Sequence, residues 1–437
     1  MRALLASTLL IAACTALPSG LPTSPATETP GGPPLPSTAG DRTLYLTDSF
    51  NGSGLIAIDP LTLRDLSARP LLPIGPGGGN SSFMASALDG SAVAVMNYWY
   101  GDRAVAQGLE ISVFDGRTGA LRARFHPEVP VIVDGLSPDG SRIYARNWPP
   151  RELTAERLVL DASTGKILER EPRIDLASDA VAYARDERGR RLYALLVPIA
   201  PNATGPQPVE LGAWDLSTGK ELWRLGLPTL AAGQWLTGRT IDGLAVRSSL
   251  APGLGLSPDG RQLAVVKEVG CCVPGGTLWL IDAQGGKIIS ERAYGPKASF
   301  FDRLVAPLVA EAKSWDESVG VSASFFPDGR TLHVYAQSSR VDEQGEPRHQ
   351  YLGMAAVRLA DASVTGTDIK MELLWYENRI LWVRPSPDGR WLYVFLQRAG
   401  SPDPDRYVLR RLDPATLRVL AERRFDGYRQ AYLLASR

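Results

Sequence analysis

A segment of similar design occurs seven times along this chain of 437 residues. In each copy an apolar strand is followed by a second strand that ends in aspartate, then by a short turn and a third strand. The seven aspartates are Asp59, Asp115, Asp161, Asp215, Asp282, Asp361 and Asp413. A repeat this small, built from one sheet, cannot bury its faces alone and has to stack on its neighbours. The repeats therefore predict an all-β fold, a seven-bladed β-propeller.

The turns that introduce most of these strands have the form Ser-Pro-Asp-Gly, as in Ser257 to Gly260 and Ser386 to Gly389. Pro presets the first backbone angle, Asp bonds back to its own turn and Gly takes the left-handed position. The strands beside the turns, such as Gln262 to Val266 and Trp391 to Phe395, are almost continuously apolar. That composition is typical of strands covered on both faces, here by neighbouring blades.

The two ends of the repeat region complement each other. Residues 428–435 form an apolar strand that stops where a turn should follow, and residues 40–46 resume just after such a turn. Joined together, the two segments rebuild one repeat. The sequence therefore predicts that the C-terminal strand is the innermost strand of the first blade and closes the ring. A chain this long fits one ring, because each blade adds its own interface.

The first forty residues are predicted to be a targeting region. Arg2, the apolar residues 3–11 and the small pair Ala12-Ala13 form an export signal that is too short to span a bilayer. Ile11 to Cys14 is similar to the lipobox of bacterial lipoproteins, which implies removal of residues 1–13 and lipidation (acyl groups such as palmitate) of Cys14. The alternative is a plain secretory signal in which Cys14 is incidental. Residues 14–40 would then form a Pro-, Ser- and Thr-rich disordered tether, and residues 41–437 the propeller.

The charge of the chain is balanced, with 47 basic and 47 acidic side chains. No strong field favours nucleic acid, so no nucleic-acid partner is predicted. The basic run from Arg185 to Arg191 contains Asp186 and Glu187, and it is interpreted as a solvated turn.

The repeats resemble the YVTN and PD40 (TolB-like, WD40-like) families of bacterial propellers. Leu44 to Thr47 and Leu55 to Asp59 match the first family, and the Ser-Pro-Asp-Gly-Arg turns match the second. The resemblance covers residues 41–437. It implies the architecture and leaves the function open, because these families include lactonases, surface proteins and assembly factors.

The seven aspartates are interpreted as turn residues whose carboxylates accept backbone N–H groups two residues on, not as metal ligands. The three histidines His126, His333 and His349 lack metal-ligand spacing, and His333 is expected to be packed in a strand. No nucleophile elbow or phosphate loop is present. The sequence therefore predicts no catalytic residue, no metal site and no cofactor.

Residues Ala213 to Trp223 match the tryptophan-docking motif of quinoprotein alcohol dehydrogenases. The Trp occurs in one repeat only, and the predicted blade count is one short of the eight in that family. Trp223 is therefore interpreted as a packing residue between blades.

Two adjacent thiols, Cys271 and Cys272, are the only ones left in the exported domain. The oxidising compartment favours a strained vicinal disulfide, and a soft metal contact or two inert thiols are the alternatives. Residues 299–312 show helical periodicity and predict a short helical insertion between the fifth and sixth blades.

Aromatic segments are predicted to gather around one end of the ring, where they form a face for a ligand or partner. The residues assigned to this face are Tyr98, Trp99, Tyr100, Trp148, Cys271, Cys272, Trp315, Trp375, Glu377 and Arg379. The alternative is that these aromatics pack on one another and seal long loops.

The sequence as a whole predicts a lipoprotein held at the cell membrane or outer membrane by its N-terminal lipid, with the propeller on the extracytoplasmic side. Its predicted function is a binding or scaffolding module for a protein or an envelope polymer. The alternative is a propeller enzyme of the quinoprotein dehydrogenase or lactonase type.

Overall fold

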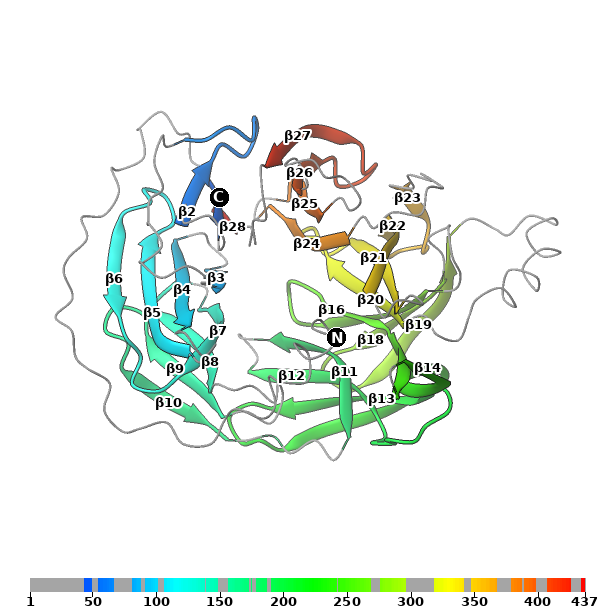
Figure 1. Ribbon diagram of the computed structural model, residues 1–437. Coiled ribbons are helices and arrows are strands. Elements are labelled where there is room, and N and C mark those ends of the chain that lie inside the picture. The colour runs from blue at the N-terminus through cyan, green and yellow to red at the C-terminus, as the bar shows by residue number, and fades with distance from the viewer. Residues whose placement is uncertain are drawn as a thin grey trace. The chain divides into compact units, whose positions relative to one another are not determined.

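The protein is described from a computed structural model (Figure 1). The described residues are 43–48, 54–66, 81–87, 91–100, 106–137, 139–147, 156–172, 174, 178–186, 190–241, 243–268, 276–295, 318–341, 347–367, 379–386, 389–397, 407–425 and 434–436. These ranges contain strands and turns and no helix, so the described fold is all-β. Within them, no helix could cross a membrane. The predicted helical insertion at 299–312 lies outside the described residues.

The chain divides into two compact units. The first comprises the chain up to Arg170 together with Phe425–Arg437. Its strands are β1 (Thr43–Asp48), β2 (Gly54–Ile58), β3 (Ser81–Ser86), β4 (Ala92–Tyr100), β5 (Ala106–Asp115), β6 (Leu121–Phe125), β7 (Val131–Leu136), β8 (Arg142–Asn147), β9 (Arg157–Asp161), β10 (Ile167–Glu171) and β28 (Leu434–Ser436). They form the antiparallel sheets β28-β1-β2, β3-β4-β5-β6 and β7-β8-β9-β10.

The second unit is Glu171–Arg424. Its strands are β11 (Asp179–Asp186), β12 (Arg191–Val197), β13 (Gln207–Asp215), β14 (Glu221–Ile241), β15 (Leu244–Ala251), β16 (Gly253–Leu256), β17 (Gln262–Glu268), β18 (Gly276–Asp282), β19 (Lys287–Tyr294), β20 (Ser318–Phe325), β21 (Thr331–Val341), β22 (Pro347–Arg358), β23 (Val364–Thr367), β24 (Arg379–Pro385), β25 (Leu392–Gln397), β26 (Tyr407–Leu412) and β27 (Val419–Phe425). They form the sheets β16-β17-β18-β19 and β24-β25-β26-β27 and a nine-stranded sheet.

Four of the described sheets are meanders of four consecutive strands, and within each unit the first strands of successive meanders lie beside each other. In the first unit β28 contacts β3 and β3 contacts β7; in the second unit β11 contacts β16 and β16 contacts β20. This serial stacking of small meanders is a β-propeller arrangement. The predicted fold class is confirmed at that level.

The C-terminal strand joins the sheet of the N-terminal strands, as the sequence predicts. Antiparallel β28 pairs Ser436 with Thr43 and Leu434 with Tyr45 of β1. Because β28 occupies the edge opposite β2, it takes the place that the first strand has in the other sheets. The first sheet is thus built from both ends of the chain.

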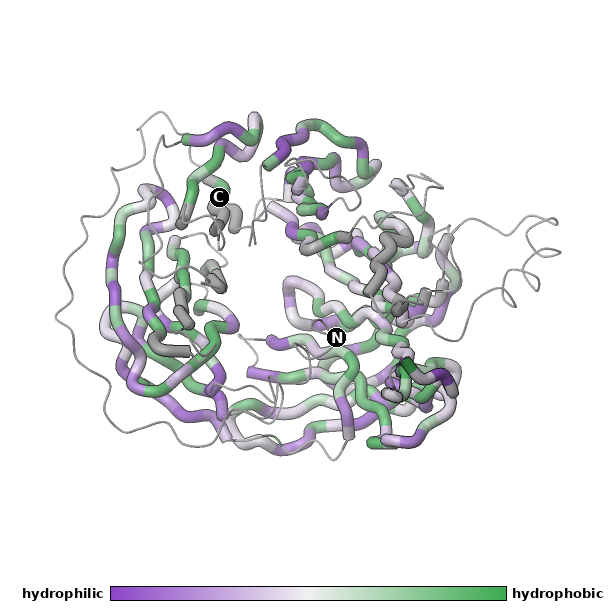
Figure 2. Tube along the Cα trace, viewed as in Figure 1, coloured by the Kyte–Doolittle hydropathy of each residue, from purple (hydrophilic) through white to green (hydrophobic). Residues whose placement is uncertain are grey.

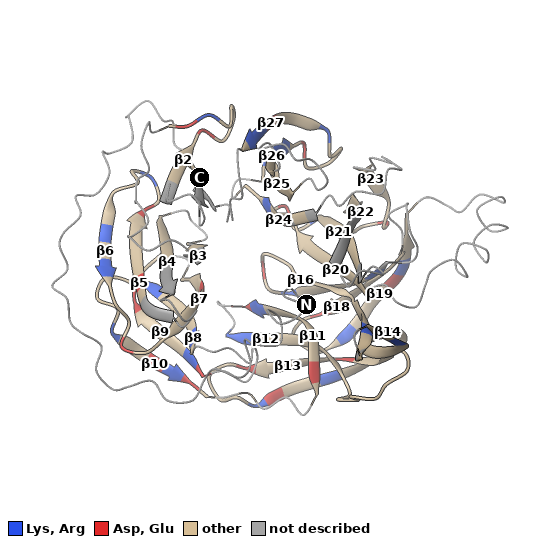
Figure 3. Ribbon diagram, viewed as in Figure 1, with Lys and Arg blue, Asp and Glu red and all other residues tan. Residues whose placement is uncertain are grey.

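The hydrophobic core lies between successive sheets. In the first unit, one cluster joins Ala94 and Ile111 of the second sheet to Ile143 and Leu158 of the third. In the second unit, clusters of the same kind join each sheet to the next. Hydrophobic residues recur along the strands and hydrophilic ones at the turns (Figure 2), while acidic and basic residues are interspersed (Figure 3). Burial of both faces of β17 and β25 confirms the prediction for these apolar strands.

A hairpin that the sequence does not predict links two sheets of the second unit. The 21 residues of β14 pair first with β13 and then, from Gly233 onward, with β15. The end of β15 pairs in parallel with β20, where Leu250 meets Val319. As a result, β11-β12-β13-β14 and β20-β21-β22-β23 are joined through β15, past the sheet β16–β19.

Candidate functional site

Each sheet has two chemically different ends. The turn end carries the tight connections between first and second strands and between third and fourth strands. The loop end carries the connections between second and third strands and between successive sheets. At the turn end, β19 begins at Lys287 soon after β18 ends at Asp282; at the loop end, β19 and β20 are separated from Tyr294 to Ser318.

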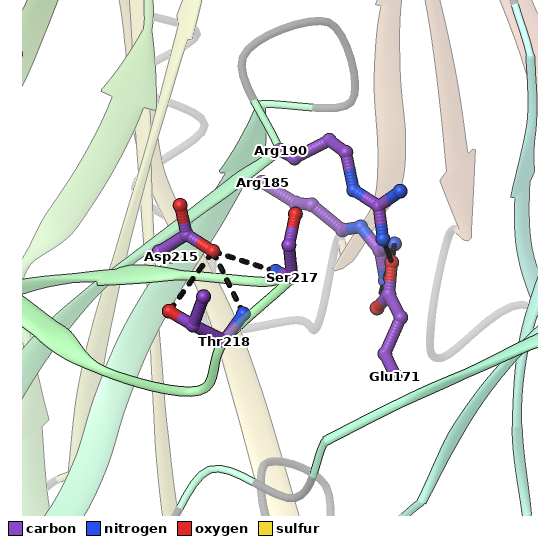
Figure 4. Close-up of polar contacts among 6 residues, drawn as sticks. All are labelled: Glu171, Arg185, Arg190, Asp215, Ser217 and Thr218. Atoms are coloured by element: carbon purple, nitrogen blue, oxygen red, sulfur yellow. Dashed lines mark hydrogen bonds and ion pairs between the residues drawn. The ribbon is translucent and has the colours of Figure 1, made fainter.

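The aspartates at the turn end stabilise the turns in which they lie by accepting hydrogen bonds. Asp215 Oδ1 accepts hydrogen bonds from the backbone N–H groups of Ser217 and Thr218, both at 2.8 Å, and from Thr218 Oγ1 at 3.2 Å (Figure 4). These bonds lower the pKa of Asp215, the bond from the Thr218 N–H most of all. Asp59, Asp115, Asp161 and Asp413 accept N–H groups in the same way. The predicted turn role is confirmed for these residues.

The aspartate of the sixth repeat stands in a different register. β22 ends at Arg358, whose N–H donates to the Ser363 carbonyl. In the fourth repeat the equivalent bond runs from the Asp215 N–H to the Lys220 carbonyl, so Arg358 occupies the position of Asp215. Asp361 therefore lies inside the turn, where its carboxylate accepts the N–H and hydroxyl of Ser363 at 3.0 and 2.7 Å. The prediction that Asp361 closes the strand is wrong by three residues, because β22 already ends at Arg358 and the turn begins there.

The basic run from Arg185 to Arg191 is not simply solvated. Arg185 Nη2 lies 3.1 and 3.2 Å from the two carboxylate oxygens of Glu171, whose side chain is only 2% exposed, and Arg190 Nη2 lies 3.4 Å from Glu171 (Figure 4). A carboxylate this buried needs such partners, because an uncompensated buried charge is costly. The interpretation of this run as a solvated turn is corrected: it supplies a buried ion pair.

Side chains of one sheet also donate to turn carbonyls of the next. Trp223 Nε1 donates to the Ala283 carbonyl at 3.2 Å, and a Cβ on Gly286, whose φ is +64°, would come within 2.5 Å of the Trp223 ring. His333 Nε2 lies 2.8 Å from the Pro414 carbonyl, and its ring meets Phe326 edge-to-face at 5.2 Å. Both residues therefore hold neighbouring sheets together, as predicted for Trp223 and for a packed His333.

The predicted binding face is described only in part. Tyr98, Trp99 and Tyr100 lie at the loop end of β4, where they pair with β5 as part of the strand instead of forming a loop. Arg379 opens β24 opposite Gln397. The remaining residues of that face, Trp148, Cys271, Cys272, Trp315, Trp375 and Glu377, lie outside the described residues, as does Cys14.

The β14–β15 hairpin adds a hydrogen-bonded element to the loop end of the second unit. The Leu236 N–H donates to the Ala203 carbonyl at 2.8 Å, and Arg247 Nη2 donates to the Pro201 carbonyl at 3.1 Å. Trp235 is 6% exposed on the same hairpin. No turn signature in the sequence marks this hairpin except Gly238 and Gly243, which both have positive φ.

Among the described residues, no group of three or more His, Cys, Asp or Glu side chains could hold a metal ion.

Comparisons with known proteins identify no family. No family model matches this sequence, and no curated protein sequence does. The fold is similar to a putative 6-phosphogluconolactonase from Bacteroides uniformis (14% identity, 90% of this chain and 100% of that one, TM-score 0.46). It is also similar to BamB from Moraxella catarrhalis (13% identity, 79% and 91%, TM-score 0.33) and to the Dos1 propeller (12% identity, 91% and 88%, TM-score 0.41).

Proposed function

We propose that the chain is a seven-bladed β-propeller lipoprotein of the YVTN/PD40 type, whose loop end binds a protein or a cell-envelope polymer. The blade count rests on the described sheets. The first unit supplies three blades, and the second supplies β16–β19, β24–β27 and the two halves of the nine-stranded sheet on either side of β15.

The observation that carries the proposal is the difference between the two ends of each sheet. Turn-end connections are short and internally hydrogen-bonded, so they offer little to a partner. Loop-end connections are longer: β17 and β18 are separated from Glu268 to Gly276, and β23 and β24 from Thr367 to Arg379. The hairpin β14–β15 also projects there. Long connections on a rigid scaffold are where proteins place recognition.

The anchor in this proposal is the lipid on Cys14, with residues 15–40 as the tether. The tether enters β1 at Thr43, which pairs with the last residue of β28 and lies opposite the β1–β2 connection. That is the turn end of the first sheet. The tether therefore leaves the loop end of that first sheet open to a partner on the extracytoplasmic side.

Photo-crosslinking in native membranes tests the proposal. A photoreactive amino acid replaces Ile199 or Thr240, both exposed at the loop end, or Ser217 or Gln284, both exposed at the turn end. We expect discrete adducts with a protein or polymer from Ile199 and Thr240. Adducts from the turn-end positions alone would contradict the proposal, and so would adducts of equal yield from all four.

A quinone-dependent enzyme is the second candidate, because residues 213–223 match the docking motif and Trp223 docks on the next sheet. The other propeller enzyme type considered for this chain is a lactonase. Titration with the quinone of quinoprotein alcohol dehydrogenases would separate these readings: saturable quenching of tryptophan fluorescence would favour the enzyme, and its absence the binding module.

A further inference from the structure

Stacked repeats usually contact only the repeats on either side of them. One element of the second unit departs from this rule. It consists of the second part of β14 together with β15, residues 233–251, and we call it the strap. The strap starts on the β11–β14 sheet and ends on β20, the first strand of the β20–β23 sheet. It therefore joins two sheets that are separated in the chain by the complete β16–β19 sheet.

The strap is continuous with the β11–β14 sheet. Up to Ala232, β14 pairs with β13, and from Gly233 onward it pairs with β15. Gly233 has a φ of +100°, which glycine adopts without strain, and a Cβ there would lie 3.2 Å from the Val197 side chain. The Leu236 N–H also binds the Ala203 carbonyl in the connection between β12 and β13. The backbone thus passes from one partner strand to the next while it stays fixed to its own sheet.

The far end of the strap is bound to the β20–β23 sheet by main-chain contacts. Leu250 is opposite Val319 in a parallel pairing that continues for one more pair. The Ser249 N–H donates to Ser318 Oγ at 3.0 Å. Because β14 pairs with the other edge of β15, this N–H points away from β14 and toward β20.

The middle sheet begins at the same place. Only Pro252 separates β15 from β16, which is the first strand of the β16–β19 sheet. A Cβ added at Gly253 or at Gly255 of β16 would lie 3.0 Å from a backbone atom of Ala323 in β20. Glycine in a strand permits such a close approach of two backbones, so β16 lies directly against β20. Three sheets therefore meet within a few residues of the end of the strap.

Each of these three sheets is in contact with the other two. One hydrophobic cluster joins the β11–β14 sheet to the β16–β19 sheet, and a second joins the β16–β19 sheet to the β20–β23 sheet. The strap supplies the third contact, between the first sheet of the three and the last. In a simple stack an end sheet can open by losing one interface, whereas here the opening of any of the three breaks two. Opening one sheet should therefore cost nearly as much free energy as opening all three.

We propose that the strap makes the three sheets from β11 to β23 a single cooperative folding unit. The β24–β27 sheet adjoins the β20–β23 sheet through one hydrophobic cluster and, within the described residues, has no strap of this kind. It should therefore open separately from the other three. The strap also holds the loop ends of the three sheets in one arrangement, which pre-organises the connections that they carry.

Native-state hydrogen exchange of the full chain, followed by mass spectrometry of its peptides, tests the strap. In the wild type the slowest amides of β12, β17 and β21 should share one opening equilibrium constant within about twofold, because a single opening exposes all three strands. The slowest amides of β25 should have a different constant, since that sheet opens separately.

Three variants separate the strap from the rest of the fold. Ser249→Pro removes the N–H that binds Ser318, and the opening constant of β21 should rise at least about tenfold above that of β12. Ala245→Pro is the matched control, because Ala245 is exposed on the same strand and pairs only with β14 among the described residues. It should leave the constants of β12 and β21 equal within about twofold. Ser318→Ala removes the acceptor and keeps the backbone, and it should separate the two constants by about threefold.

Different opening constants for β12, β17 and β21 in the wild type would overturn the proposal. Equal effects of Ser249→Pro and Ala245→Pro would do the same. So would a rise in Ser249→Pro that is equal in all three strands, because the sheets would then form one unit without the strap. If Ser249→Pro does not fold, Ser318→Ala decides, and equal constants for β12 and β21 in that variant would contradict the proposal.

Discussion

His333 occupies a position in the second strand where other sheets carry tyrosine. It pairs with Ala356 as Tyr193 pairs with Ala213 and Tyr393 with Arg411, near the start of each strand. All three side chains are buried. The ring of His333 reaches the Pro414 carbonyl in the turn of the next sheet, and this ring can also titrate.

Burial lowers the pKa of His333 below its ordinary value of 6.5, although the Pro414 carbonyl opposes the shift. The folded state therefore holds the neutral ring, while the unfolded chain takes up a proton near pH 6.5. Stability is full above that pH and falls as the pH drops below it, by up to about 1.4 kcal/mol per pH unit, until the lower folded-state pKa is passed.

Urea unfolding at a series of pH values between 7 and 4 checks this expectation. His333→Gln should remove the part of the decline that belongs to this residue. An identical pH dependence in wild type and His333→Gln would show that the buried ring does not titrate as argued.

Trp223 allows a residue-scale test of the contact between two sheets. Trp223→Ala removes the hydrogen bond to Ala283 and the ring over Gly286, and should cost about 2–3 kcal/mol of the free energy of unfolding. Trp223→Phe keeps a ring and should cost about 1 kcal/mol. Leu222→Ala, at the exposed neighbour, should cost less than about 0.5 kcal/mol. Chemical denaturation measures all three; similar losses for the Trp223→Ala and Leu222→Ala variants would rule out this contact as a stabilising one.

At the scale of elements, the sequence predicts the turns and strands that are specified by residues close together in the chain. The Ser-Pro-Asp-Gly turns appear with Gly140 and Gly260 at positive φ, because proline, aspartate and glycine specify that turn by their own geometry. The strands and the turn aspartates can be predicted for the same reason, because local residues specify them. The register of Asp361 cannot be predicted in this way, since it depends on where β22 ends against β21.

Elements whose strand pairing depends on residues far apart in the chain could not be predicted from the sequence. The parallel pairing of β15 with β20 joins residues about 70 positions apart, and no local pattern marks it. The bulges at Leu222 and Ile289 leave apolar residues exposed where a simple alternation would bury or pair them. The buried pairing of Glu171 with Arg185 joins residues 14 positions apart, and in sequence it is indistinguishable from a solvated charge run.

Of the candidate site, the sequence predicts which residue types gather at the loop end and not how they are arranged. The structure gives Tyr98, Trp99 and Tyr100 a strand position, and it adds the hairpin around Trp235 that sequence patterns overlook. Strands can be inferred from periodicity, whereas the path of a long connection depends on contacts that no repeat encodes.

At the scale of the whole molecule, the account depends on closure by the chain termini. The first sheet takes β28 from one end of the chain and β1 and β2 from the other. This pairing covers an edge of β1 that would otherwise be open to other strands. The seven-blade proposal requires it, because the first sheet lacks a first strand without β28.

Disulfide formation between the paired termini tests closure most directly. The account predicts that Thr43→Cys with Ser436→Cys, which are opposite each other in β1 and β28, forms a bond under mild oxidation, found by peptide mass mapping as the loss of two hydrogens. Thr43→Cys with Leu434→Cys is the control, because Leu434 pairs with Tyr45 instead. A bond in the first pair only, with a raised melting temperature, is the predicted result. No bond in either pair, or equal yields in both, would contradict closure by the C-terminal strand.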